Sequence, residues 1–239
     1  MDNDLISAVP ASNPDRDAMT DYALTAASAL LPIVGGAISD TARGMISRKA
    51  EERQHQFDTL VALEVTRLAE RVEDITPQAM VESDEFMAAY AKVSRVAAET
   101  ESIEKRQRLA AALTHMGPWS GIDSTRRHDL LNLVARYHDS DIFLLRYFRN
   151  PVTWLSENAT GWQPGRYELA GIGTILGDYV FAGQSDWRPS VDASISRFEA
   201  DGVANVPMGT TMSESGTVDR RTTAFGNQLL DFIADPAAN

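Results

Sequence analysis

The residues of this chain that could do chemistry are acids, histidines and one glycine-rich stretch. Asp139 and Asp141 stand two residues apart, and a pair of carboxylates at this spacing can hold a cation. No calcium-loop spacing surrounds them, and a helix is expected to begin at this point. The sequence therefore predicts a helix-capping turn at Asp139–Asp141 rather than a metal site.

The other candidate motifs fail on spacing. Four histidines stand apart in the sequence: His55, His115, His128 and His138. With no His-x-x-x-His pair and no cysteine, no zinc site is predicted. The stretch GIGTILG, residues 171–177, resembles a dinucleotide-binding loop, but Leu176 takes the place of its third glycine, so close helix packing is expected instead. The chain also lacks a nucleophile elbow and a phosphate-binding Gly-Lys-Thr loop, so we expect no enzyme, no cofactor and no metal.

The composition is that of an acidic globular protein. Of the 239 residues 44% are hydrophobic, which suffices for a sizeable core, and the formal net charge is −12. Because nucleic acids and anionic lipids are polyanions, this charge opposes a non-specific grip on either. The lack of cysteine fits a reducing compartment, and no secretory signal is recognised, so a cytoplasmic location is expected.

One segment near the N-terminus carries no charge, from Tyr22 to Ser39. Pro32 and the pair Gly35–Gly36 interrupt it, so a membrane-spanning helix is disfavoured. Burial in a helical core is the main interpretation, while a self-association surface and a reversible membrane contact stay open. The side chains that would make either contact are Leu30, Leu31, Ile33, Val34 and Ile38.

The first half of the chain has the pattern of a helical bundle. Apolar residues at three- and four-residue steps predict one long amphipathic helix that ends near Asp74. Start signals for three further helices follow it: Thr76–Pro77, Ser83 and Ser102. We expect a flexible leader over residues 1–21 and an antiparallel bundle over residues 22–120.

The second half, residues 121–239, has shorter elements. Helices are predicted after Ser124, over 142–148, from Pro189 to Gly202 and over 224–233. Residues 150–165 hold two prolines and two tryptophans, which predicts a packed loop, and residues 167–181 predict a weak helix. Residues 203–207 and 217–223 can pair as a β-hairpin, so the expected fold is mostly α with one hairpin.

The end of the chain resembles the second half of a winged-helix domain. The helix SVDASISRFEADGV ends in glycine, a polar hairpin contains Asp219–Arg220–Arg221, and TAFGNQLLDFI closes the segment. DRR followed by Thr-x-x-Gly is similar to the wing of MarR-type bacterial regulators. The resemblance implies a C-terminal winged-helix-like domain whose contacts with DNA or a partner come from Arg188, Arg197, Arg220 and Arg221.

The charges near this helix favour a protein partner over DNA. Asp192, Glu199 and Asp201 accompany Arg197, and acids that face phosphate repel it. Most of the chain is also similar to bacterial abortive-infection alpha-type proteins, through EKRQRLAAALTHM, DLLNLVARYHDSDIFLLRYF and TAFGNQLLDFI. That resemblance implies a role in phage–host conflict and brings no catalytic motif.

Two functions from different classes follow. The first is a non-enzymatic interaction or effector protein of phage defence or prophage biology, which forms a homo-oligomer through its helical half and docks a protein partner through its winged helix. The second is a dimeric winged-helix transcription regulator that binds double-stranded DNA. The acidic charge favours the first, and membrane contact is a disfavoured third possibility.

Overall fold

The computed structural model describes residues 40–72 and 75–234, which are mostly helical with a small two-stranded antiparallel sheet. The predicted fold class is confirmed. The chain divides into two compact units between Ala135 and Arg136, so the helix after Ser124 belongs to the first unit, and the division falls later than the expected one at residue 120. The expected leader and the uncharged segment with Leu30, Leu31, Ile33, Val34 and Ile38 lie outside the described residues.

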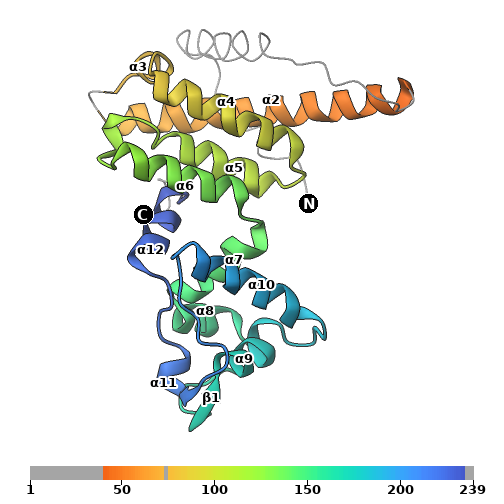
Figure 1. The fold of residues 1–239 in the computed structure, drawn as a ribbon, viewed down its shortest axis with the longest axis vertical. Coiled ribbons are helices and arrows are strands. Elements are labelled where there is room, and N and C mark those ends of the chain that lie inside the picture. The colour runs from red at the N-terminus through yellow and green to blue at the C-terminus, as the bar shows by residue number, and fades with distance from the viewer. Residues whose placement is uncertain (1–39, 73–74, 235–239) are drawn as a thin grey trace. The chain divides into compact units, whose positions relative to one another are not determined.

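The N-terminal unit is built around one long helix, α2 (Asp40–Arg71), which confirms the predicted amphipathic helix. Figure 1 shows α4 (Asp84–Glu99) and α5 (Ile103–Leu113) lying alongside it, and both pack against it. The short helix α3 (Pro77–Val81) contacts α2 and α4, and α6 (Ser124–Arg136) completes the unit. The result is a helical bundle in which α4 buries one apolar stripe and α5 is buried on nearly all sides.

The predicted start signals fix the beginnings of these helices. The side-chain oxygens of Thr76, Ser83 and Ser102 each accept a hydrogen bond from the backbone N–H three residues on, at 2.9–3.4 Å. Each bond satisfies one amide that has no partner inside its helix. The helix stripes meet in a core that includes Phe57, Val61, Val65, Phe86, Tyr90, Val93 and Leu109.

The C-terminal unit is centred on α7 (Asp139–Arg149). This helix packs against α8 (Pro151–Asn158), α10 (Trp187–Ala200) and α12 (Ala224–Phe232). The prediction of a loop over residues 150–165 is therefore wrong for its first half, because a proline stands at the first position of α8 and is well suited to start a helix.

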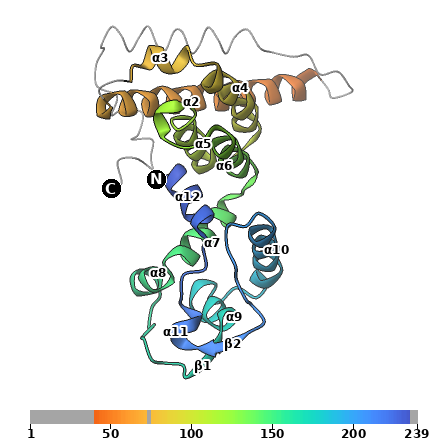
Figure 2. The same ribbon diagram turned by 60° about the vertical axis from the view of Figure 1, so that its left-hand side comes forward.

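The sheet joins two short strands that are distant in sequence. Strand β1 (Leu169–Gly171) pairs antiparallel with β2 (Thr211–Ser213), as Figure 2 shows. After β1 the chain forms α9 (Ile172–Ile175) and a π-helical turn (Leu176–Val180). The weak helix expected over residues 167–181 is thus a strand followed by two short turns of helix.

The predicted hairpin between residues 203–207 and 217–223 is reduced to one antiparallel bridge. Ala204 faces Thr222 across this bridge, and the segment between them contains β2 and the short helix α11 (Glu214–Thr217). The second segment cannot begin at residue 217 because that residue ends α11. The paired strands of the unit are consequently β1 and β2 rather than the two arms of a wing.

The start of α12 lies against the bridged segment at backbone distance. Thr223 N donates to Val203 O at 3.0 Å, and a Cβ added at Gly226 would stand 2.0 Å from the same Val203 oxygen. Only glycine permits this approach. The closing helix predicted from TAFGNQLLDFI is confirmed, and its glycine is explained by this contact.

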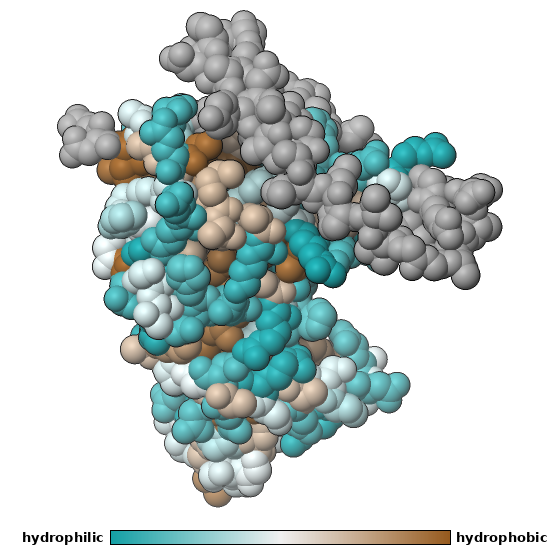
Figure 3. Space-filling view, turned by 45° about the horizontal axis from the view of Figure 1, so that its top comes forward, coloured by the Kyte–Doolittle hydropathy of each residue, from teal (hydrophilic) through white to brown (hydrophobic). Residues whose placement is uncertain are grey.

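The outer surface gives a mixed picture. On the face drawn in Figure 3, hydrophilic residues predominate and hydrophobic residues appear as small separate groups. Among the described residues no helix is both long and apolar enough to cross a membrane.

Candidate functional site: an aromatic hollow in the C-terminal unit

The four arginines singled out in the sequence do not form one surface. Arg188 and Arg197 lie nine residues apart on α10, which is two and a half turns, so their side chains leave the helix on opposite sides. Arg188 Nε contacts the Asp192 carboxylate one turn further on, at 3.0 and 3.1 Å. A recognition helix needs its cations on one face, and α10 does not present them so.

Arg197 turns inward and holds a buried carboxylate. Its Nη2 donates to Asp141 Oδ1 at 2.6 Å, and Ser194 Oγ donates to the same oxygen at 2.7 Å. The other oxygen, Oδ2, accepts from His138 N at 2.9 Å, which caps α7 as predicted. Burial alone would raise the pKa of Asp141. The hydrogen bonds from these three donors lower the pKa by more than burial raises it, so the pKa lies below its ordinary value.

Arg220 and Arg221 follow α11 and differ from each other. Arg221 donates to Gly216 O and to Met212 Sδ, so its guanidinium closes the loop around β2. Arg220 is exposed and donates from Nε to Arg149 O at 3.2 Å. Of the four arginines, Arg188 and Arg220 are the exposed ones, and each donates its hydrogen bonds from Nε.

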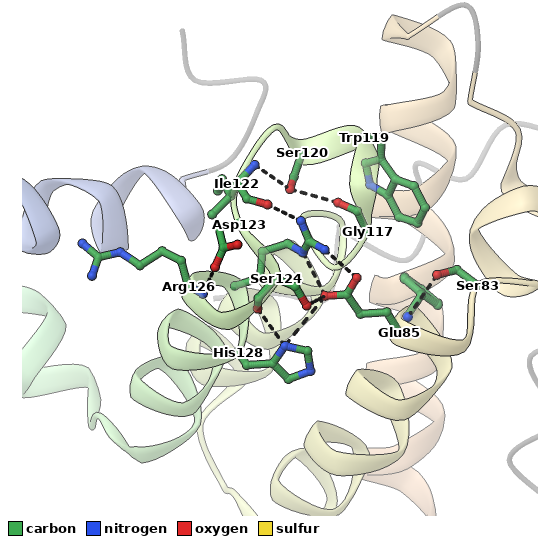
Figure 4. Close-up of polar contacts among 12 residues, drawn as sticks. Ser83, Glu85, Gly117, Trp119, Ser120, Ile122, Asp123, Ser124, Arg126 and His128 are labelled. Carbon is green, nitrogen blue, oxygen red and sulfur yellow. Dashed lines mark hydrogen bonds and ion pairs between the residues drawn. The ribbon is translucent and has the colours of Figure 1, made fainter.

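The N-terminal unit contains a second polar cluster, which Figure 4 shows. Arg127 is buried and donates to Glu85 from Nε at 2.9 Å and from Nη2 at 2.5 Å, while its Nη1 donates to Ile122 O. Ser124 Oγ donates to Glu85 Oε1 at 3.1 Å, and His128 Nδ1 lies 3.7 Å from that oxygen. The hydrogen bonds from Arg127 hold the pKa of Glu85 below its usual range.

These residue types invite comparison with a hydrolytic triad, but the bonding differs. The histidine of a triad accepts the proton of the nucleophilic hydroxyl, whereas His128 Nδ1–H donates to the backbone oxygen of Ser124 at 2.8 Å. Ser124 Oγ donates directly to Glu85, a carboxylate already engaged by Arg127 and therefore a weak base. The cluster ties α4 to α6. Within the described residues no group of three or more His, Asp or Glu could hold a metal ion.

A row of aromatic rings runs through the C-terminal unit and ends at its surface. Neighbouring centroids are 5.3–6.4 Å apart along Phe148, Tyr147, Trp154, Phe143, Phe181 and Trp187. Contacts at these separations each stabilise by about 0.5–1.5 kcal/mol beyond the burial of area. Phe143 stands in the middle of the row, yet 38% of it is exposed. Among the large apolar side chains that are exposed in the described residues, Phe143 is the one that belongs to this row.

A hollow of about 490 Å³ lies where this row meets solvent, between α7, the segment before α10 and α10 itself. Phe143, Leu144 and Val191 contribute apolar surface, and Phe181 and Trp187 contribute two stacked rings with an interplanar angle of 6°. The Trp187 ring is fixed by Gly177, where an added Cβ would lie 3.3 Å from it. The volume falls in the range of about 300–1,000 Å³ typical of ligand pockets.

The polar side chains that line the hollow are not engaged within the molecule. Five of them make no side-chain hydrogen bond or ion pair inside the described part of the chain: Ser140, Gln184, Ser185, Asp186 and Ser190. Ser194 is committed to Asp141. The hollow is thus lined both by apolar side chains and by donors and acceptors without internal partners, and ligand pockets combine these two kinds of lining.

Sequence reasoning missed this site, although one signal for it was present. Residues 142–145 are four consecutive apolar residues in a helix, and a helix cannot turn four successive side chains to one side. Phe143 is the one that points outward. The ring partners of Phe143 are Trp154 on the next helix and Phe181 further along the chain, and no local pattern connects the three.

The GIGTILG stretch behaves as expected. A Cβ at Gly173 would lie 2.8 Å from Arg188 Nη1, and Gly177 lies against Trp187, so both glycines serve close packing.

Comparisons with protein-family models, with curated proteins and with solved structures each found no match, so the function is argued from the geometry of the site.

Proposed function

We propose that this chain is a non-enzymatic interaction protein that docks a partner protein through the aromatic hollow of its C-terminal unit. The observation that carries the proposal is the exposed ring of Phe143, in a hollow that is also lined by polar side chains which, apart from Ser194, have no partner within the described residues. Aromatic anchors in such hollows supply a large share of the free energy of protein association.

The biological setting comes from the sequence. The similarity to abortive-infection alpha-type proteins favours an effector of phage defence or prophage biology that acts in the cytoplasm. The uncharged segment around Leu30 and Ile38 is the proposed self-association element of that effector. The net charge of −12 supports a protein partner over a polyanion.

A second candidate is the dimeric winged-helix regulator of double-stranded DNA. Arg220 favours it, because within the described residues this exposed guanidinium donates only to Arg149 O and could reach a phosphate. The opposite orientation of Arg188 and Arg197 counts against it, since two of the four proposed contacts would then face away from each other.

A peptide-display selection against the full chain tests the docking proposal. Selected peptides should bind the wild type and lose at least about tenfold in affinity with Phe143→Ser, because burying a phenylalanine contributes about 1.5–3 kcal/mol. Val152→Ser is the matched control, since Val152 is an exposed apolar residue of the same unit outside the hollow. Equal affinity for wild type and Phe143→Ser would contradict the proposal. Retention of duplex DNA that depends on Arg220 would favour the regulator.

A further inference from the structure

The hollow carries a single formal charge. Asp186 is the one ionisable residue among those that line it, and it has no ion pair within the described residues. The two arginines of α10 do not neutralise it, because Arg188 is held by Asp192 at 3.0 Å and Arg197 by Asp141 at 2.6 Å. An occupant of the hollow therefore meets one negative charge that has no ion-pair partner within the described residues.

The apolar lining of the hollow suits an alkyl chain. Phe143, Leu144 and Val191 present apolar surface to the hollow, which Asp186, Gln184 and serine side chains also line. Lysine and arginine cover apolar surface with their methylene stems while their charged heads stay in a polar, hydrated setting. A side chain of this kind matches both the apolar lining of the hollow and the negative charge of Asp186, whereas the charge of an acidic side chain would be repelled by Asp186.

We propose that the partner inserts a lysine or arginine side chain into the hollow, with its stem over Phe143 and its cationic head at Asp186. This inference rests on the docking function proposed above and names the chemistry of the partner segment. The charge of the whole chain adds to the selection, because a net charge of −12 attracts basic segments from a distance.

A titration followed at the indole N–H of Trp187 tests the proposal on the full chain. The ¹⁵N-labelled protein gives four tryptophan indole signals, and Trp187→Phe identifies the one in the hollow. Pentalysine is one probe, and its fully Nε-acetylated form is the other, with the same backbone and length but no side-chain charge. Pentalysine should shift the Trp187 signal to saturation, and the acetylated peptide should leave it in place.

Two matched variants separate a local effect from a general attraction of charge. Asp186→Asn should weaken pentalysine binding at least about fivefold, which corresponds to the loss of one charged contact of about 1 kcal/mol. Glu199→Gln removes an exposed acid from the same helix, outside the lining of the hollow, and should change the affinity less than twofold. Phe143→Ser should abolish the saturable shift of the Trp187 indole signal on addition of pentalysine.

Three results would overturn the proposal. Equal weakening by Asp186→Asn and Glu199→Gln would mean that pentalysine senses only the overall acidity. No change at Trp187 with either peptide would mean that the hollow takes no cationic side chain. Equal binding of the acetylated peptide would refute the role of the charge, yet the docking function would stand, because the Phe143→Ser comparison in the display selection judges it separately.

Discussion

The two units bury their polar groups in different ways. The N-terminal unit is made of regular helices, the longest of 32 residues, and its buried polar side chains bond across helices, as Glu85 does with Arg127 and Asp58 with Tyr90. The longest helix of the C-terminal unit has 14 residues, and short irregular elements are held by aromatic rings and one buried carboxylate. In the described part of the second unit, polar side chains without internal partners line a hollow. The proposed docking function rests on this hollow.

The largest expected effect comes from the closest backbone contact of the C-terminal unit. Gly226→Ala would place a Cβ 2.0 Å from Val203 O, and neither backbone can move without breaking the bond from Thr223 N. We expect a loss of about 3 kcal/mol or more in the stability of this unit, at the upper end of overpacking effects. Native-state amide hydrogen exchange reports the two units separately.

Gly209→Ala is the matched control for that change, because nothing lies within 4 Å of the position of its Cβ. It should change the opening free energies obtained from hydrogen exchange by less than about 0.5 kcal/mol. If Gly226→Ala leaves the protection of α12 unchanged, the packing described between α12 and the bridged segment is wrong.

A pair of buried aspartates should give the units opposite responses to pH. The pKa of Asp141 is lowered in the folded protein, so its contribution to stability is present above the unfolded value of about 3.9 and is lost as the pH falls through the folded pKa. Burial raises the pKa of Asp58, despite hydrogen bonds from Tyr90 and Gln54 that lower it. Its contribution is therefore full below about pH 3.9 and is lost as the pH rises through the folded pKa.

Asparagine substitutions measured at two pH values test this contrast. At pH 7, Asp141→Asn should destabilise the C-terminal unit by about 2 kcal/mol, because Arg197 loses its buried partner. Asp58→Asn keeps an acceptor for Tyr90 and should be neutral or stabilising in the N-terminal unit. Urea midpoints at pH 7 and pH 4 measure both effects. Equal destabilisation by the two substitutions at pH 7 would contradict the account.

The secondary structure of the N-terminal unit can be predicted from the sequence more completely than that of the C-terminal unit, for a physical reason. Helical periodicity and cap residues are local signals, so α2 and the starts at Thr76, Ser83 and Ser102 were all predictable. Strands of three residues carry no periodicity, and β1 finds its partner about 40 residues further along the chain, where Leu169 faces Ser213. Tertiary contacts decide such elements.

The same reason explains what was missed at the candidate site. The arginines were identifiable by residue type, but whether each side chain faces inward or outward depends on tertiary packing. Arg197, for example, forms an ion pair with the buried Asp141. The hollow depends on Phe143, Phe181 and Trp187, which come from three elements. A one-dimensional pattern gives the apolar run around Phe143 and no information about what covers it.

The smallest expected effect compares two buried tyrosines. Tyr90 OH donates to Asp58 at 2.6 Å, whereas Tyr147 OH is buried without a hydrogen-bond partner in the described structure, and burial raises its pKa. Tyr90→Phe should cost about 1 kcal/mol, and Tyr147→Phe should be neutral or stabilise by up to about 1 kcal/mol. Thermal unfolding of the two variants gives the comparison, and a destabilising Tyr147→Phe would show that this hydroxyl is satisfied in solution.

Site-specific photo-cross-linking in living cells tests the docking surface most directly. A photoreactive phenylalanine analogue is placed at position 143, in the hollow, and in a second protein at position 152, the exposed control on α8. The account predicts a discrete cross-linked product from position 143 that free pentalysine suppresses in lysate and that position 152 does not form. The same product from both positions, or none from position 143 while position 152 reacts, would contradict it.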